Sequence, residues 1–217
     1  MIAAIDDILK AKGRHAVGGG TVPWIQLSLV LVGCGFIYGA VMGSYDMRVL
    51  QAAYSGLKVP LFLGVSTLIC LPSFYAVNSF LGLRADFAAA FRGILASQAC
   101  LAVCLTALAP VTAFTYLSVD NYRFAIIFNG IMFAVGTLAG QQSLSRHYKP
   151  LILANPRHRA GKMIWVLVYV FVAIQMAWVL RPFIGAPGLP TRFFREEAWS
   201  NAYVEIARIL AGLFDLR

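Results

Sequence analysis

The chain has 217 residues, of which 60% are hydrophobic and only 12% are charged. Soluble domains carry about 25% charged residues, so this composition excludes an ordinary soluble domain and indicates a polytopic membrane protein. The net charge of +9 would suggest nucleic-acid binding in a soluble chain. Here the Lys and Arg residues lie between apolar runs, where they would meet anionic lipid headgroups, so we expect a lipid bilayer around the chain and no nucleic-acid partner.

Residues 1–23 are expected to form a cytoplasmic amphipathic segment. Ile2, Ile5 and Leu9 share one helix face, and charged side chains surround it. A helix of this kind can lie in the plane of the headgroups, although a partly ordered tail fits the pattern equally well.

Five apolar runs follow, and residues 24–180 are expected to form one transmembrane bundle. Each run is close to the length of about 20 helical residues that crosses the hydrocarbon core of a bilayer. The predicted fold class is therefore all-α, a polytopic helical bundle with an amphipathic interfacial helix at each end. The predicted spans are Trp24–Tyr45, Pro60–Leu83, Phe87–Ala109, Phe124–Leu144 and Met163–Leu180.

The second and third runs are separated only by Arg84-Ala85-Asp86. So short a connection predicts that the two spans are antiparallel neighbours, an αα-hairpin in lipid. Pro72 is expected to kink the second span, and Pro110 to break or kink the outer end of the third.

Glycines recur at intervals of four residues in two of the spans. A helix face of this kind lets another helix backbone approach closely. Packing within the bundle and a homodimer seam are both compatible with the pattern. The candidate packing residues are Gly35, Gly39, Gly43, Gly136 and Gly140.

Four uncharged polar side chains fall inside the spans, and they are Asn78, Gln98, Asn129 and Gln175. An unpaired amide in hydrocarbon costs several kcal/mol, so these groups should face protein or water. Asn78 and Gln98 are placed where a hairpin could bring them together, while local hydrogen bonds are the alternative for each. We expect no carboxylate, lysine or arginine deep inside any span.

Two connections between spans have a distinct composition. Asp46–Lys58 mixes apolar and polar residues and is expected to be a short connection of one or two helical turns on the outer face. Ser145–Lys162 is the most basic connection, and we expect a loop that rests on anionic headgroups.

Residues 181–217 begin with a turn-rich joint and continue as a predicted amphipathic helix from Phe193. This extracytoplasmic tail is too interrupted by charge to span a membrane. Its aromatic side chains could anchor a protein partner or lie in the headgroup layer. They are Phe193, Phe194, Trp199 and Tyr203.

The residues needed for intramembrane catalysis or metal binding are not grouped in the sequence. Cys100 and Cys104 share a helix face, but no histidine or carboxylate is near them in sequence, and His147 and His158 are placed in a connection. Ser73 has no basic residue placed to activate it. We therefore predict no enzyme activity, no metal and no cofactor.

The distribution of Lys and Arg predicts the orientation. The N-terminal segment has three such residues, the turn after the second span two and the basic connection five, against three on the opposite side before the tail. The excess places the N-terminus in the cytoplasm and the C-terminus outside.

The hairpin resembles the Yip1-like superfamily of small five-span membrane proteins. The similarity rests on a kinked second span closing on Gly82, a short charged turn, Phe87-x3-Phe91-Arg92 opening the third span, and Pro110 closing it. The predicted topology also matches, whereas the extension after Arg181 departs from a minimal member. The resemblance implies a non-enzymatic role in membrane organisation or trafficking, here in the bacterial inner membrane.

Two functions follow as hypotheses. The first is a scaffold, adaptor or assembly subunit that holds a membrane protein partner or a second copy of the chain. The second is a small oligomeric channel or transporter for a neutral solute or an ion, with the four polar side chains along its path.

Overall fold

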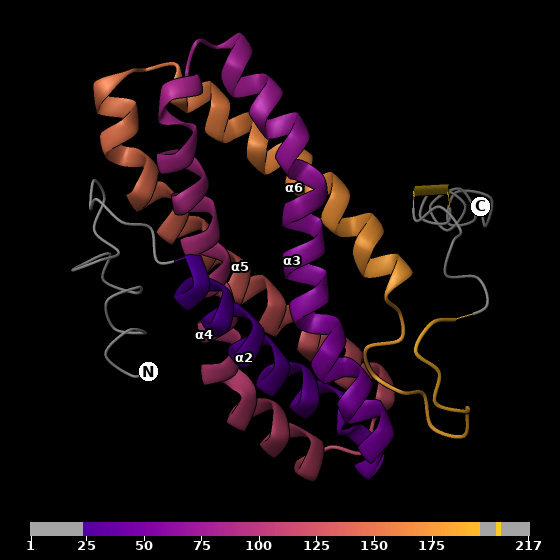
Figure 1. The fold of residues 1–217 in the computed structure, drawn as a ribbon. Helices are drawn as coiled ribbons and strands as arrows, with labels where there is room; N and C mark the ends of the chain where they lie inside the picture. Colours follow the sequence, from indigo (N-terminus) through magenta and orange to yellow (C-terminus); the bar gives the residue numbers. More distant parts are fainter. Residues whose placement is uncertain (1–23, 196–202, 205–217) are drawn as a thin grey trace, which may run out of the picture.

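The computed structural model describes residues 24–195 and 203–204 (Figure 1). Every regular element in these ranges is helical, and five helices are long and apolar enough to cross a membrane. The all-α class and the five predicted spans are therefore confirmed. The predicted amphipathic segment at the N-terminus and most of the helix predicted at the C-terminus, including Trp199, lie outside the described residues. The spanning helices are α2 (Trp24–Gly43), α3 (Val49–Phe80), α4 (Phe87–Ser118), α5 (Tyr122–Ala154) and α6 (His158–Val179).

Three helices are longer than the sequence pattern predicts. α3 and α4 have 32 residues each and α5 has 33, about 48 Å at 1.5 Å per residue, which exceeds a ~30 Å hydrocarbon core. The predicted connection Asp46–Lys58 is wrong beyond residue 48, because its second part forms the first turns of α3.

The predicted break at Pro110 and the predicted loop Ser145–Lys162 differ from the structure for a related reason. Pro110 lies inside α4, and Pro150 lies inside α5. A proline removes only one backbone hydrogen bond, and neighbouring helices tolerate that loss in membrane proteins. The basic stretch predicted as a loop is therefore helical up to Ala154, with a break only at 155–157.

The predicted pairing of α3 with α4 is also wrong. The two helices are joined by the 3₁₀ turn η3 (Arg84–Asp86), but they contact each other little, and α2 packs extensively against both of them. α4 packs on α5 with its other side, and α6 packs mainly on α3. α4 is the most buried spanning helix and α6 the least.

The glycine face of α2 explains why α2 and not α4 is the neighbour of α3. A Cβ added to Gly39 would overlap the Ser55 carbonyl oxygen and lie 2.9 Å from Gly56 Cα, and one on Gly43 would lie 2.6 Å from Gln51 O. Only glycine permits so close an approach of two backbones.

The second glycine pair lies against α4. A Cβ on Gly136 would lie 3.1 Å from the Leu105 side chain, and one on Gly140 would lie 3.2 Å from Ser97 O. All five candidate packing glycines, Gly35 included, therefore face helices of the same chain.

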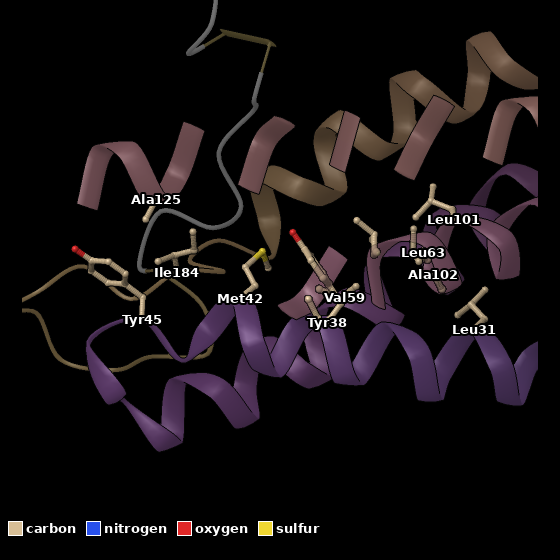
Figure 2. Close-up of a cluster of buried hydrophobic side chains, with 12 residues drawn as sticks. Leu31, Tyr38, Met42, Tyr45, Val59, Leu63, Leu101, Ala102, Ala125 and Ile184 are labelled. Atoms are coloured by element: carbon tan, nitrogen blue, oxygen red, sulfur yellow. The ribbon is translucent and has the colours of Figure 1, made fainter. Parts of the chain in front are cut away.

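The largest buried cluster joins α2, α3, α4 and α5 near the ends that meet the tail. Figure 2 shows Met42 and Tyr38 of α2 beside Val59 and Leu63 of α3. Ile184, which follows α6, also belongs to this cluster. The segment after α6 is thus part of the core and not a free joint.

Candidate functional site

A cavity of about 620 Å³ lies among α3, α4, α5 and α6. α5 and α6 share a short turn but contact each other sparsely, and in Figure 1 they diverge from it. Side chains of α5 and α6 line this cavity, and two of them, Ile126 and Val170, are also exposed on the outside of the bundle. The volume of the cavity falls within the ~300–1,000 Å³ range of small-molecule sites.

The shape and chemistry of the cavity are those of an apolar slot. On α5 the lining extends from Tyr122 to Gln141, about 28 Å of helix at 1.5 Å per residue. Most lining side chains are apolar, among them Phe62, Phe133 and Ile174. This stretch belongs to a helix that is long and apolar enough to span a membrane, so the slot runs along that helix and suits a long apolar molecule.

Asn129 lies in the wall of the cavity but its amide is engaged by the protein. Tyr38 Oη donates to Asn129 Oδ1 at 3.0 Å, and Asn129 Nδ2 donates to Tyr116 Oη at 2.7 Å and to Ala125 O at 2.8 Å. The side chain is 3% exposed. Asn129 therefore ties α2, α4 and α5 together and offers little to a solute.

Gln98 also lines the cavity, where its Oε1 accepts a hydrogen bond from Tyr169 Oη at 3.1 Å. Asn78 lies elsewhere and donates to Phe74 O at 2.8 Å. The predicted hydrogen bond between Asn78 and Gln98 is wrong, because α3 and α4 diverge. Gln175 is half-buried on α6 and is not part of the lining.

The segment 181–184 lines one end of the cavity, and a polar face of α3 holds this segment in place. Gln51 Nε2 donates to Pro182 O and to Phe183 O, both at 3.1 Å, and Lys58 Nζ donates to Pro182 O at 2.6 Å. Ser55 Oγ also donates to Phe183 O. The segment can therefore keep Phe183 and its neighbours against the cavity.

Arg48, just before the first turn of α3, extends this set. Its guanidinium donates to Ala186 O at 2.9 Å, to Leu189 O at 2.6 Å and to Thr191 Oγ1 at 2.7 Å. Arg48, Gln51, Ser55 and Lys58 are spaced at i, i+3, i+7 and i+10, which places them on one helix face. We refer to these four residues as the polar stripe.

Sequence reasoning missed the polar stripe because it placed residues 46–58 in a connection. Lys58 is fully buried and lies inside α3, in the part of this helix that was predicted to be a connection. Its ammonium also lies 4.9 Å from the centre of the Phe193 ring, a cation–π contact. The helical spacing of the four polar residues was the signal that could have identified them.

Three of the four aromatic residues predicted to bind a partner lie in the described part of the chain, and all three contact other residues of this chain. Phe193 packs edge-on against Tyr54 at 5.3 Å, and Phe194 packs on Phe193 at 4.8 Å. Tyr203 stacks on Phe171 of α6 at 4.6 Å. Phe193 therefore lies against α3 and Tyr203 against α6.

The two histidines predicted in a connection are buried in helices. His147 lies in α5, and its Nδ1 is 2.9 Å from Ser143 O. His158 begins α6, is 1% exposed, and lies 3.1 Å from the Asp86 carboxylate. Among residues 24–195, no three His, Cys, Asp or Glu side chains come together as metal ligands would.

Comparison of the chain with protein-family models, with curated proteins and with solved structures gave no match. The resemblance to the Yip1-like superfamily therefore stays a prediction.

Proposed function

We propose that this chain is a non-enzymatic integral membrane protein that binds an elongated molecule of the lipid class. The observation that carries the proposal is the apolar slot of about 620 Å³ along α5. A molecule that fills it would replace contacts with lipid tails by contacts with Phe62, Phe133 and their neighbours. Such a molecule could enter sideways, between α5 and α6.

The chemistry of the lining favours this role over the channel or transporter. A hydrated ion needs polar groups to replace its water shell, and the walls offer mostly carbon atoms. The amide of Asn129 is already bonded to Tyr38, Tyr116 and a backbone carbonyl. The scaffold role stays a prediction without added support, since the glycines and most of the candidate aromatic residues are used in packing within the chain.

The test introduces a large side chain at a residue that lines the slot, so that this side chain fills the space a ligand would occupy. Gly130 lines the cavity, and a Cβ added there meets no atom within 4 Å, so Gly130→Trp should occupy the space without moving a helix. We expect the purified wild-type chain to retain a lipid-class molecule through detergent washing, and the variant to retain at least about ten-fold less. Mass spectrometry of an organic extract measures the retained molecule.

Val135→Trp is the matched control, because Val135 lies on the same helix, is 42% exposed and does not line the cavity. It should retain as much as the wild type. Equal retention by the Gly130 and Val135 variants, both folded by circular dichroism, would contradict the proposal.

We also propose that the chain lies in the bacterial inner membrane with its N-terminus in the cytoplasm, as the distribution of Lys and Arg predicts. Ser118 and Arg159 lie near opposite ends of the bundle and are exposed. A membrane-impermeant maleimide should label Ser118→Cys in intact spheroplasts and Arg159→Cys only after lysis. The four native cysteines lie in spanning helices and give the background. The reverse labelling pattern would overturn the orientation.

A further inference from the structure

We infer that the molecule in the slot is a lipid with an anionic headgroup. Arg181 and Arg195 would hold this headgroup at the end of the cavity that the segment after α6 lines, which we call the tail end. This inference rests on the proposed function and adds the charge of the ligand to it. The proposed occupant is an anionic lipid that comes from the membrane leaflet next to residues 181–195.

The charge of the cavity is concentrated at one end. Arg181 and Arg195 are its only charged residues among the described lining side chains, and no carboxylate is among them. Both follow α6, whereas the opposite end of the slot is lined by neutral groups such as Gln98 and Gln141. The slot therefore has a cationic mouth and an apolar shaft, which matches the two parts of an anionic amphiphile.

Neighbouring residues affect both arginines of the cationic mouth: a second positive charge lies near Arg195, and contacts with Trp178 position Arg181. Lys58 is close enough to Arg195 for their like charges to interact, and it is fixed by its bond to Pro182 O. The Arg181 guanidinium lies 3.1 Å from the centre of the Trp178 ring, and its Nε donates to Trp178 O. An anion at the mouth would relieve the repulsion between Lys58 and Arg195.

The depth of the mouth suits a headgroup. α6 has 22 residues, about 33 Å of helix, which is close to the ~30 Å hydrocarbon thickness. Arg181 lies two residues beyond its end, so its guanidinium is at the level of the headgroup layer. A lipid with its phosphate there would direct an acyl chain along α5 into the slot, in the direction of the other lipids in that leaflet.

The test measures the preference of the full chain for one headgroup. The protein, purified and washed in non-ionic detergent, is incubated with equal amounts of phosphatidylglycerol and phosphatidylcholine that have the same acyl chains. Native mass spectrometry counts each bound lipid. We expect about ten-fold more phosphatidylglycerol bound than phosphatidylcholine, and Arg195→Gln should abolish this preference without changing the binding of phosphatidylcholine.

Two variants distinguish lipid binding in the cavity from lipid binding at the protein surface. Arg192→Gln removes a nearby arginine that does not line the cavity and should leave the preference intact, while Gly130→Trp should remove binding of both lipids. Equal binding of the two lipids by the wild type, lost in Gly130→Trp, would overturn the anionic headgroup and leave the proposed function standing. A preference that survives Arg195→Gln overturns the inference as well. If the wild type and Gly130→Trp bound the lipids equally, both the proposed lipid binding in the slot and the anionic headgroup would be contradicted.

Discussion

Gly39→Leu is expected to prevent the chain from folding, and Gly39→Ala to destabilise it. The Cβ of either side chain would overlap the Ser55 carbonyl oxygen and approach Gly56 Cα. Both obstacles are backbone, which no rotamer change can move, so α2 and α3 must separate. Overpacking of this kind costs about 1–3 kcal/mol and occasionally more. The free energy of unfolding of Gly39→Ala, measured by equilibrium SDS titration in mixed micelles, should fall by at least that amount.

Gly33→Ala is the control on the same helix. A Cβ there meets no atom within 4 Å, and alanine is a better helix former than glycine by about 1 kcal/mol. The control should therefore be as stable as the wild type or slightly more stable. If Gly39→Ala matched Gly33→Ala, the close contact of α2 with α3 would be refuted.

Simultaneous replacement of Gln51 by leucine and Lys58 by methionine is expected to detach the segment 181–184, which lines one end of the cavity. Pro182 O would lose both of its donors, and Phe183 O would keep only Ser55. A buried acceptor without a donor costs about 1–3 kcal/mol, which is enough to favour local opening of this segment. Limited proteolysis with chymotrypsin in detergent should cut the double variant after Phe183, at the Phe183–Ile184 bond, at least about ten times faster than the wild type.

The matched control is Gln142→Leu with Lys162→Met. Gln142 is exposed, and Lys162 bonds only to the exposed Ser145 hydroxyl in the part of the chain that the structure describes. Removal of these groups leaves no buried carbonyl without a donor, so cleavage after Phe183 should stay at the wild-type rate. Equal cleavage of the two double variants would show that the polar stripe does not hold the segment.

The sequence predicted the number and class of the helices because each span carries its own signal. A run of apolar residues about as long as the bilayer is thick needs no partner to be identified. The ends of the helices were harder to predict, because Pro110 suggested a break or kink and the basic residues of Ser145–Lys162 suggested a loop. Neighbouring helices allow α4 and α5 to continue through Pro110 and Pro150.

The arrangement of the helices could not be predicted from the runs alone. The short turn at Arg84-Ala85-Asp86 suggested that α3 and α4 are neighbours, yet the glycines of α2 bring that helix closer to α3 than α4 can come. The cavity follows from the same arrangement. It exists because helices adjacent in sequence diverge, which depends on contacts between residues far apart in the chain.

The position of the slot also determines how its occupancy must be described. A molecule that enters between α5 and α6 comes from the leaflet, where lipids are neighbours at very high density, and not from the aqueous phase. Occupancy by mass action then follows the mole fraction of that lipid in the membrane and its exchange against the other lipids present. A modest preference for one lipid would keep the slot filled wherever that lipid is abundant. Enrichment or depletion of that lipid in the membrane would directly change the fraction of chains whose slot is occupied by it.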